Sequence, residues 1–394
     1  GASGAMMVAP PDQVALLGCY VLLGYVLWRW LDGPGRAARF RRGLAPLGAA
    51  TATGALLAAA PLLLTVLFAG SSQRAAISYA EAIRGSLHPA SLMTAVIADI
   101  FGAGDPNVEY WGPSSMAWNP GILSLSQNMG EVYFGILPVL AILTIGLTRG
   151  LLFDRNIRFF TLALVLMVVY ALGGYTPGFR LMYDWLPGVS GFRRPADAVF
   201  LIGGLGGIVG GYLVHCWLAG RLAPAGRLRT GLKLTLFATL LVIAGYVAVR
   251  AGHFGAAAKP LLLAIALMLA ALLALRLLER HAAVAPALSA TALAAFMVFD
   301  LGLNNGPNES TALPPKSYEV MQQDTRNRTI ALLKARLAQV TDPARRDRVE
   351  LLGVGFEWPN LGMIHGFDHV LGYNPLRLRE FVEATGAGDT IAGR

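Results

Sequence analysis

Two adjacent arginines, Arg193 and Arg194, are the residues whose chemistry is easiest to infer from this sequence. They are followed by Pro195, which restricts the backbone beside them. A guanidinium group binds phosphate oxygens through paired N–H donors, so two neighbouring arginines predict a phosphate-binding site. The alternatives are contact with lipid headgroups and an ion pair with Asp197.

A second group of candidate residues lies in a turn-rich stretch that ends at Pro113. It contains two carboxylates, Asp105 and Glu109, and two aromatic residues, Tyr110 and Trp111. A carboxylate can remove the proton from an attacking hydroxyl group, so both acids are candidate catalytic bases and the aromatics are candidate substrate contacts. The alternative is a solvated loop whose aromatic residues anchor it at the membrane surface.

An amphipathic pattern precedes this stretch. Apolar residues recur in pairs every four residues between Leu92 and Phe101, while Ser91, Thr94 and Asp99 occupy the other face. This period predicts a helix that lies in the membrane interface rather than across the bilayer. The carboxylate of Asp99 makes it a third candidate catalytic base.

The composition of the chain indicates which class of structure must hold these residues. The chain has 394 residues, of which 55% are hydrophobic and only 14% are charged, whereas an average soluble domain has about 25% charged residues. This excludes a disordered chain, a coiled coil and an ordinary soluble enzyme. The net charge of +9 does not indicate a nucleic-acid partner, because the basic residues fall between apolar runs and report membrane topology.

Apolar runs of membrane length predict a mainly α-helical, polytopic membrane bundle with about eight transmembrane helices. The runs are 14–31, 44–69, 132–147, 159–172, 198–219, 232–249, 260–277 and 282–303. The third and fourth fall short of the roughly 17 residues that a straight span needs, so a re-entrant segment is the alternative for each.

Every second connection between these runs is short and basic, which is the pattern of the cytoplasmic side. The loops 70–131 and 173–197 then lie outside the cytoplasm, together with both ends of the chain. We therefore expect a transmembrane domain at 1–303 and a small extracytoplasmic α/β segment at 304–394. Asp300 is the one acid inside the predicted spans, and an intramembrane acid is a candidate substrate-binding residue by default.

Several stretches of the outer loops resemble the YfhO-type family of bacterial membrane proteins, which looks like a branch of the GT-C glycosyltransferase superfamily. The stretches are Ser72-Gln-Arg74, Tyr110-Trp-Gly, Tyr133-Phe-Gly-Ile-Leu-Pro, Tyr175-Thr-Pro, Leu186-Pro-Gly-Val-Ser-Gly-Phe-Arg193-Arg-Pro and Leu371-Gly-Tyr-Asn-Pro375. Each motif alone is weak, but their order and spacing hold from about Leu44 to Pro375.

The resemblance implies a fold of GT-C type and an enzyme of the bacterial cytoplasmic membrane. It would transfer a sugar from a polyprenyl-phosphate donor to a cell-envelope acceptor on the outer face. Arg74, in the first matching stretch, joins Arg193 and Arg194 as a candidate substrate-binding residue. The sequence has no metal-ligand pattern, and a divalent metal is left open.

Three features depart from this family. Its enzymes place a catalytic carboxylate in the first outer loop, after the first span. Because this chain opens outside with no span before Gly1, we expect a fragment that lacks the N-terminal spans and that carboxylate. The family also tends to carry a basic residue where Asp197 stands, and a fuller β-rich outer domain at the end, so the tail is expected to be truncated.

Two rival functions remain. A transporter or flippase of lipid-linked sugars predicts polar residues at mid-bilayer and broken helices in matched halves. The runs here are rich in Leu, Ala and Gly, and the glycines within 203–211 predict close helix packing instead. A non-catalytic scaffold, whose tail binds a partner, would need no arginine pair in an outer loop. Glycosyl transfer is therefore the favoured hypothesis.

Overall fold

The structure is a computed structural model in which two compact units are recognised. It describes residues 12–33, 35–72, 77–104, 108–113, 127–221, 227–279, 281, 284–306, 315–339, 347–350, 358–369 and 378–385. The first unit consists of Gly1–Leu57 and Ile77–Ser310, and the second of Ala58–Ala76 and Thr311–Arg394. One boundary between the units falls after Ser310, and the predicted division into domains after residue 303 stays a prediction; the assignment of Ala58–Ala76 to the second unit was not predicted from the sequence.

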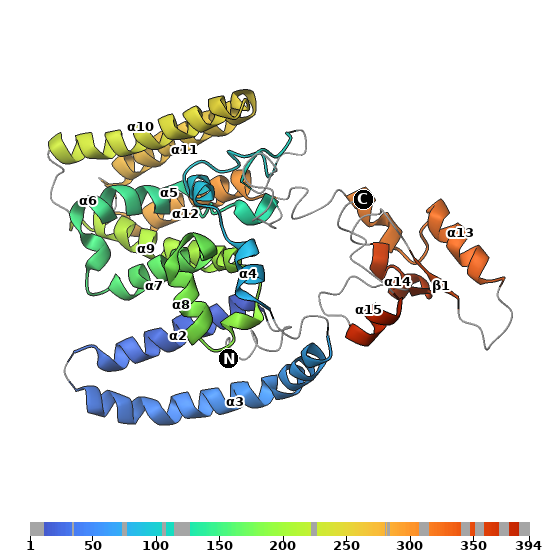
Figure 1. The fold of residues 1–394 in the computed structure, drawn as a ribbon. Helices are drawn as coiled ribbons and strands as arrows, with labels where there is room; N and C mark the ends of the chain where they lie inside the picture. The colour runs from blue at the N-terminus through green and yellow to red at the C-terminus, as the bar shows by residue number, and fades with distance from the viewer. Residues whose placement is uncertain are drawn as a thin grey trace. The chain divides into compact units, whose positions relative to one another are not determined.

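The first unit is a bundle of helices joined by short 3₁₀ turns (Figure 1). Its α-helices are α2 (Gln13–Leu31), the first part of α3 (Arg36–Gly70), α4 (Tyr79–Ala82), α5 (Ile136–Ala141), α6 (Leu147–Arg149), α7 (Arg158–Ala171), α8 (Pro177–Trp185), α9 (Val199–Leu218), α10 (Arg227–Arg250), α11 (Phe254–Glu279) and α12 (Pro286–Asn304). A π-helical segment, Ile142–Gly146, joins α5 to α6. The 3₁₀ turns are Ile83–Gly85, Pro89–Ala95, Gln127–Gly130, Leu151–Phe153, Gly173–Tyr175, Val189–Gly191 and Pro195–Ala198.

Apolar helices occur at all eight positions where the sequence predicts spans. Within the described residues, five helices are long and apolar enough to cross a membrane: Gln13–Leu31, Arg36–Gly70, Pro195–Leu218, Phe254–Leu278 and Pro286–Asn304. The prediction of a mainly helical membrane protein is thus confirmed in its coarse form. The count of eight spans stays a prediction, because the other three segments are shorter: Ile136–Arg149, Arg158–Ala171 and Thr235–Arg250.

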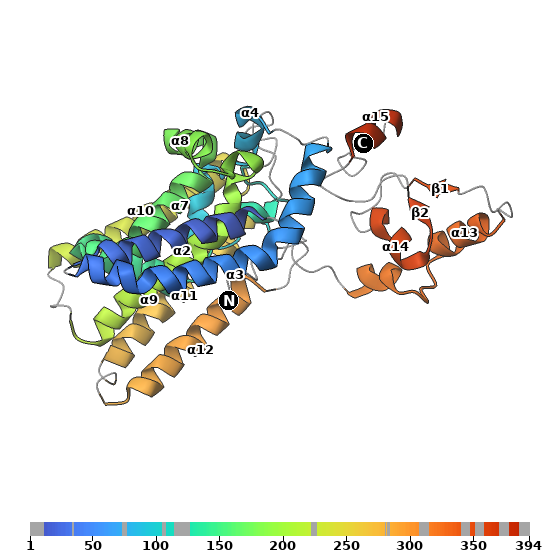
Figure 2. The ribbon, with the colours of Figure 1, turned by 90° about the horizontal axis from the view of Figure 1, so that it is seen from below.

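Contacts at both ends of α2 show that it packs antiparallel to α7. Near the start of α2, the Gln13 amide donates to the Tyr170 hydroxyl near the end of α7 at 2.7 Å. Beyond the other end of α2, the Asp32 carboxylate pairs with the Arg158 guanidinium at the start of α7 at 3.4 Å. The helix α9 packs against both α5 and α7, and α10 lies beside α11 (Figures 1 and 2).

The buried contacts between helices use small residues. Fully buried alanines line α10 (Ala244 and Ala248) and α11 (Ala257 and Ala271), and they allow the backbones to approach closely. Large apolar side chains instead face outward: Val242 is 69% exposed and Leu262 is 68% exposed. This inverted arrangement is typical of helices whose outer surface lies against lipid.

The prediction of an interfacial helix between Leu92 and Phe101 is wrong. The segment Pro89–Ala95 forms a 3₁₀ turn, and the residues after it form irregular turns. Asp99 has a φ of 56°, a left-handed conformation that cannot continue a helix. Leu92 is partly buried, and Phe101 lies in the bundle core, so the apolar pattern reports burial among the helices rather than contact with the interface.

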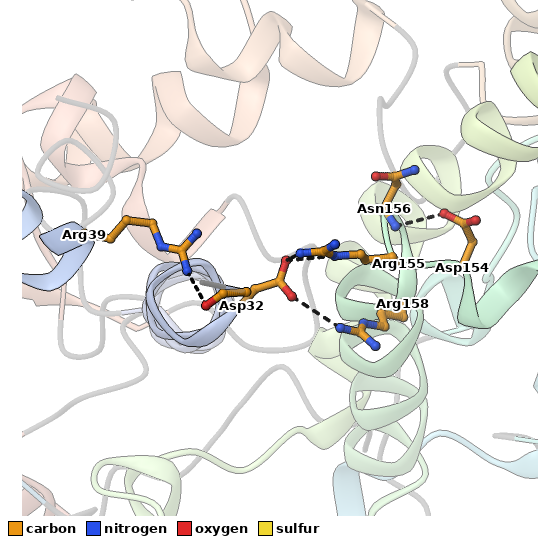
Figure 3. A network of polar contacts seen from close by, with 7 residues as sticks. Asp32, Arg39, Asp154, Arg155, Asn156 and Arg158 are labelled. Carbon is orange, nitrogen blue, oxygen red and sulfur yellow. Dashed lines mark hydrogen bonds and ion pairs between the residues drawn. The ribbon is translucent and has the colours of Figure 1, made fainter. Parts of the chain in front are cut away.

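The connections of the first unit gather at two ends. At the end that we call the carboxylate end (the described residues 77–104, 108–113, 127–135, 173–197 and 250–253), Arg194 lies 3.5 Å from the Met129 sulfur, and Trp111 stacks on His253 with ring centroids 5.6 Å apart. At the end that we call the arginine end (31–39 and 150–158), Asp32 contacts Arg155 and Arg158 (Figure 3). The alternation of cytoplasmic and outer loops stays a prediction.

The second unit is small and mixed. Its elements beyond the end of α3 are the 3₁₀ turns Pro315–Met321 and Trp358–Asn360, the helices α13 (Arg328–Leu337), α14 (Gly362–His365) and α15 (Arg379–Thr385), and the strands β1 (Arg348–Val349) and β2 (Asp368–His369). The strands pair in parallel, with Arg348 opposite Asp368. The His365 ring donates through Nε2 to the Val320 carbonyl at 2.7 Å. That this unit is an extracytoplasmic domain stays a prediction.

Candidate functional site

The backbone around Glu131 is held in place by one buried hydroxyl group. The Val132 amide donates to Thr94 Oγ1 at 2.8 Å. The Thr94 hydroxyl in turn donates to the Ser91 carbonyl at 2.7 Å and approaches the Gly130 carbonyl at 3.3 Å. Because Thr94 thus contacts the residue on each side of Glu131, it determines where the Glu131 side chain starts.

Asp99 brings a second carboxylate to the same place. Its backbone amide donates to Glu131 Oε2 at 3.3 Å. Its own carboxylate accepts a hydrogen bond from the Gly104 amide at 2.7 Å, which stabilises the turn that carries it. An aspartate tolerates the left-handed conformation of this turn better than most residues because its short side chain bonds to the local backbone.

The pKa of Glu131 is raised to about 8. The main cause is burial of its carboxyl group; the hydrogen bond from the Asp99 amide lowers the pKa in part, and the negative charge of Asp99 adds to the rise. Glu131 is therefore mostly protonated at neutral pH and gains a negative charge just above it. A carboxyl group with such a pKa can exchange protons with a substrate near physiological pH.

One of the predicted phosphate-binding arginines contacts the segment that leads to Glu131. Arg194 reaches the sulfur of Met129, two residues before Glu131, at 3.5 Å. It also forms the ion pair with Asp197 that the sequence left open, at 3.6 Å. Arg193 is exposed and has no hydrogen bond or ion pair with the other residues that the structure describes. One arginine is thus partly engaged, while the other presents its guanidinium to solvent.

A glycine allows the arginine loop to approach the turn beneath it. A side chain at Gly85 would place its Cβ 2.5 Å from the Arg193 carbonyl oxygen and 2.6 Å from the Arg194 Cα. The same turn carries Glu81, whose pKa is lowered mainly by hydrogen bonds from Ser78 and further by the nearby charge of Arg193. Only glycine permits this close backbone contact.

The other predicted site residues have different surroundings. Glu109 is exposed. Tyr110 is half-buried, and Trp111 is a core residue that packs edge-to-face on Phe101 with centroids 4.8 Å apart. Asp105 and Arg74 lie outside the described residues.

Asp300 has structural partners that account for its position. It is fully buried, and its carboxylate accepts hydrogen bonds from the Tyr133 hydroxyl at 2.5 Å and from the Ile136 amide at 2.8 Å. The Ile136 amide is the first of helix α5, whose N-cap residue is Gly135 with a φ of 104°. Since glycine has no side chain to cap the helix, Asp300 of α12 supplies the cap.

An apolar groove of about 570 Å³ lies between α5, α9 and α12. Gly207 and Gly211 of α9 line it, and a Cβ at either position would contact nothing. Gly206 and Gly210 instead carry the close packing that the sequence predicts, since a Cβ at Gly210 would lie 2.5 Å from Pro138 Cα. The groove therefore exists because α9 uses one glycine face for packing and leaves the other open.

Glu131 is the functional candidate that sequence reasoning missed. It was treated as the last residue of an outer loop, although an acid directly before an apolar run is a recognisable signal. No group of three or more histidine, cysteine or carboxylate residues suited to a metal occurs in the part of the chain that the structure describes.

Comparisons with protein-family models, with curated proteins and with solved structures found no match to this chain. The resemblance to the YfhO-type family therefore stays a prediction, as do the roles that it implies.

Proposed function

We propose that this chain belongs to an integral membrane glycosyltransferase. The enzyme moves a sugar from a polyprenyl-phosphate donor to a hydroxyl group of a cell-envelope acceptor, on the outer face of the bacterial cytoplasmic membrane. The observation that carries the proposal is the contact between Asp99 and Glu131, together with the contact of Arg194 with Met129, two residues before Glu131. Carboxyl and guanidinium groups are the two kinds of group that the reaction needs.

Glu131 is the proposed base. In its ionised form it takes the proton from the acceptor hydroxyl while that oxygen forms a bond to the anomeric carbon of the sugar. Its pKa of about 8 leaves about a tenth of the molecules ionised at pH 7. The ionised form is a stronger base than an ordinary glutamate, because Asp99 and the low polarity around it both favour proton uptake.

The arginine pair is proposed to hold the leaving group. As the bond between the anomeric carbon and the donor oxygen breaks, its electrons pass to the phosphate, which gains negative charge. Arg193 and Arg194 stabilise that charge through charge-assisted hydrogen bonds. The exposed guanidinium of Arg193 can make them without losing a partner among the described residues.

The groove supports a lipid-linked donor. Its lining, which includes residues of α12, is almost wholly apolar. An isoprenoid chain that moved from the lipid into this groove would therefore keep its contact with hydrocarbon. Tyr133 lines one part of it and lies two residues after Glu131. A donor whose chain occupies the groove would therefore keep its phosphate near the carboxylate end.

The distribution of charge supports the proposed orientation. Arg36, Arg39, Arg155 and Arg158 lie at the arginine end, and short basic connections are characteristic of the cytoplasmic side. The carboxylate end then faces outward, where cell-envelope acceptors are found.

The proposal is tested by replacing Arg193 and Arg194 with alanine in the full-length protein. Transfer in membranes supplied with a polyprenyl-phosphate sugar is expected to fall by about 100-fold, since two groups that stabilise the leaving phosphate are removed. Arg180→Ala is the matched control, because Arg180 is exposed at the same end and pairs with Asp184 on its own helix. Undiminished transfer in the double variant would remove the proposed role.

A further inference from the structure

Three arginines surround a single carboxylate at the arginine end. Asp32, just beyond the end of α2, pairs with Arg155 at 3.3 Å and with Arg158 at 3.4 Å. The third, Arg39 of α3, donates to the Gly33 carbonyl at 2.9 Å, one residue after Asp32 (Figure 3). Counting the neighbouring Asp154 carboxylate as well, three positive and two negative groups gather here (Figure 3), which leaves one positive charge unbalanced.

Two of the three guanidinium groups, those of Arg39 and Arg155, converge on Gly33. A Cβ at this glycine would lie 3.0 Å from Nη2 of Arg155 and 4.0 Å from Nη2 of Arg39. Gly33 has a φ of 80°, so the tight turn that brings the two arginines together requires a residue without a side chain.

Several donors of the cluster have no acceptor. Nε of Arg39 and Nε of Arg158 are buried without a hydrogen-bond partner among the described residues. The ion pairs with Asp32, at 3.3 and 3.4 Å, are longer than the roughly 2.8 Å of a good charge-assisted hydrogen bond. The side chain of Arg155 is also 65% exposed. The arginines therefore keep donor capacity for a second anion with several oxygens.

The cluster lies where lipid headgroups are expected. The guanidinium of Arg158 sits over the Trp28 ring at 5.0 Å, and Trp30 packs edge-to-face on Phe40 at 5.0 Å. Tryptophans are enriched at the boundary between hydrocarbon and water. The last turn of α2 and the first turns of α3 therefore mark the headgroup level.

Asp154, the residue before Arg155, makes its side-chain hydrogen bonds to other groups than the arginines. Its carboxylate accepts from the Asn156 amide at 2.9 Å and from the Tyr212 hydroxyl at 2.8 Å, and these bonds lower its pKa. Its carbonyl accepts from the Arg158 amide at 2.8 Å, which starts α7 there. Asp154 therefore stays ionised, but its carboxylate is held by these partners and forms no ion pair with the three arginines among the described residues.

We infer that Arg39, Arg155 and Arg158 form a binding site for a phosphate group, and that its occupant is the headgroup of an anionic phospholipid. Phosphate oxygens match the fork of donors that guanidinium groups present. An anionic lipid in the adjoining leaflet supplies them at high local concentration. This site lies at the other end of the bundle from the carboxyl pair and does not depend on the proposed glycosyl transfer.

The experiment titrates the full chain, purified in a neutral detergent, with short-chain (dioctanoyl) phosphatidylglycerol and measures the dissociation constant by native mass spectrometry. Dioctanoyl phosphatidylcholine and inorganic phosphate are titrated in parallel. We expect phosphatidylglycerol to bind at least about tenfold more tightly than phosphatidylcholine. If millimolar inorganic phosphate binds as well as the anionic lipid, the site is for free phosphate and the lipid assignment is wrong.

Two double variants distinguish binding at a defined site from general attraction of the anionic lipid to a basic surface. R155Q/R158Q is expected to weaken phosphatidylglycerol binding by about tenfold or more, and R41Q/R42Q by no more than about twofold, although both remove two arginines from the same end. Arg41 and Arg42 are exposed. Equal losses in the two variants would overturn the proposal. If R155Q/R158Q does not fold, the exposed Arg155→Gln alone serves, with Arg42→Gln as its control.

Discussion

Charged residues gather at both ends of the bundle, but they are arranged for different tasks. At the carboxylate end, Glu131 lies against Asp99, and burial and like charge raise its pKa to about 8. At the arginine end, Asp32 lies between opposite charges, with arginines that are largely exposed. Two carboxyl groups buried together raise a pKa toward neutral pH, which creates a group that can exchange protons. An excess of positive charge near solvent instead creates a surface that can bind anions.

The largest difference is expected in activity. Glu131→Gln removes the proposed base, so transfer from a polyprenyl-phosphate sugar should fall by about 100-fold or more. Glu109→Gln, an exposed acid of the same outer segment, should change the rate by less than about twofold. Initial rates in membranes with matched protein levels measure both. Equal rates in wild type and Glu131→Gln would show that Glu131 is not the base, and the proposed catalytic task of the carboxylate end would be wrong.

The next largest effect is expected in stability at the carboxylate end. Thr94→Val removes the hydroxyl that accepts from the Val132 amide and leaves that buried donor unpaired. The free energy of unfolding should fall by about 1–3 kcal/mol. Thr94→Ser keeps the hydroxyl and is expected to lose clearly less. Thermal unfolding in detergent compares them, and a Thr94→Val variant as stable as wild type would show that this hydrogen bond does not hold Glu131.

The two ends should also differ in their response to pH. An unfolded chain ionises Glu131 near its usual pKa of 4.5, whereas the folded chain ionises it at about 8. Between these values the folded state binds more protons, so the free energy of unfolding should fall as pH rises. Unfolding measured from pH 5 to pH 8 in wild type and Glu131→Gln tests this. The variant should show a flatter dependence, and identical slopes would mean that Glu131 is not buried in its acid form.

The smallest effect is expected at the arginine end. Arg155 is 65% exposed and its ion pair is long, so Arg155→Gln should change the free energy of unfolding by less than about 1 kcal/mol. The same melting experiment measures it. A loss comparable to that of Thr94→Val would show that this end is a structural network rather than a binding surface.

Much of the helical framework could be predicted from the sequence, because the thickness of the bilayer fixes how long an apolar run must be to form a spanning helix. All eight runs coincide with helices, including the short one that becomes α7. The helix expected at Leu92–Phe101 shows where the rule fails. Its period of apolar residues was real, but Asp99 adopts a left-handed conformation and the segment folds into the bundle.

The candidate site could be predicted only in part. The arginine pair was recognised from the sequence alone, as two guanidinium groups beside a proline in a predicted outer loop, and its role in binding phosphate stays a prediction. Glu131 was not, because its raised pKa depends on Asp99, 32 residues earlier in the chain, and on burial that no local pattern reports. Asp300 was singled out for its depth, and it became a helix cap because Gly135 cannot cap α5 itself.

The most direct test of the carboxyl pair is the dependence of the transfer rate on pH. If ionised Glu131 is the base, kcat/KM for the polyprenyl-phosphate sugar should rise about tenfold per pH unit below its pKa and level off near pH 8. Glu131→Gln should lack this rise at every pH. A wild-type profile that is flat from pH 6 to pH 9, or a Glu131→Gln profile that still rises to a plateau near pH 8, would contradict the assignment.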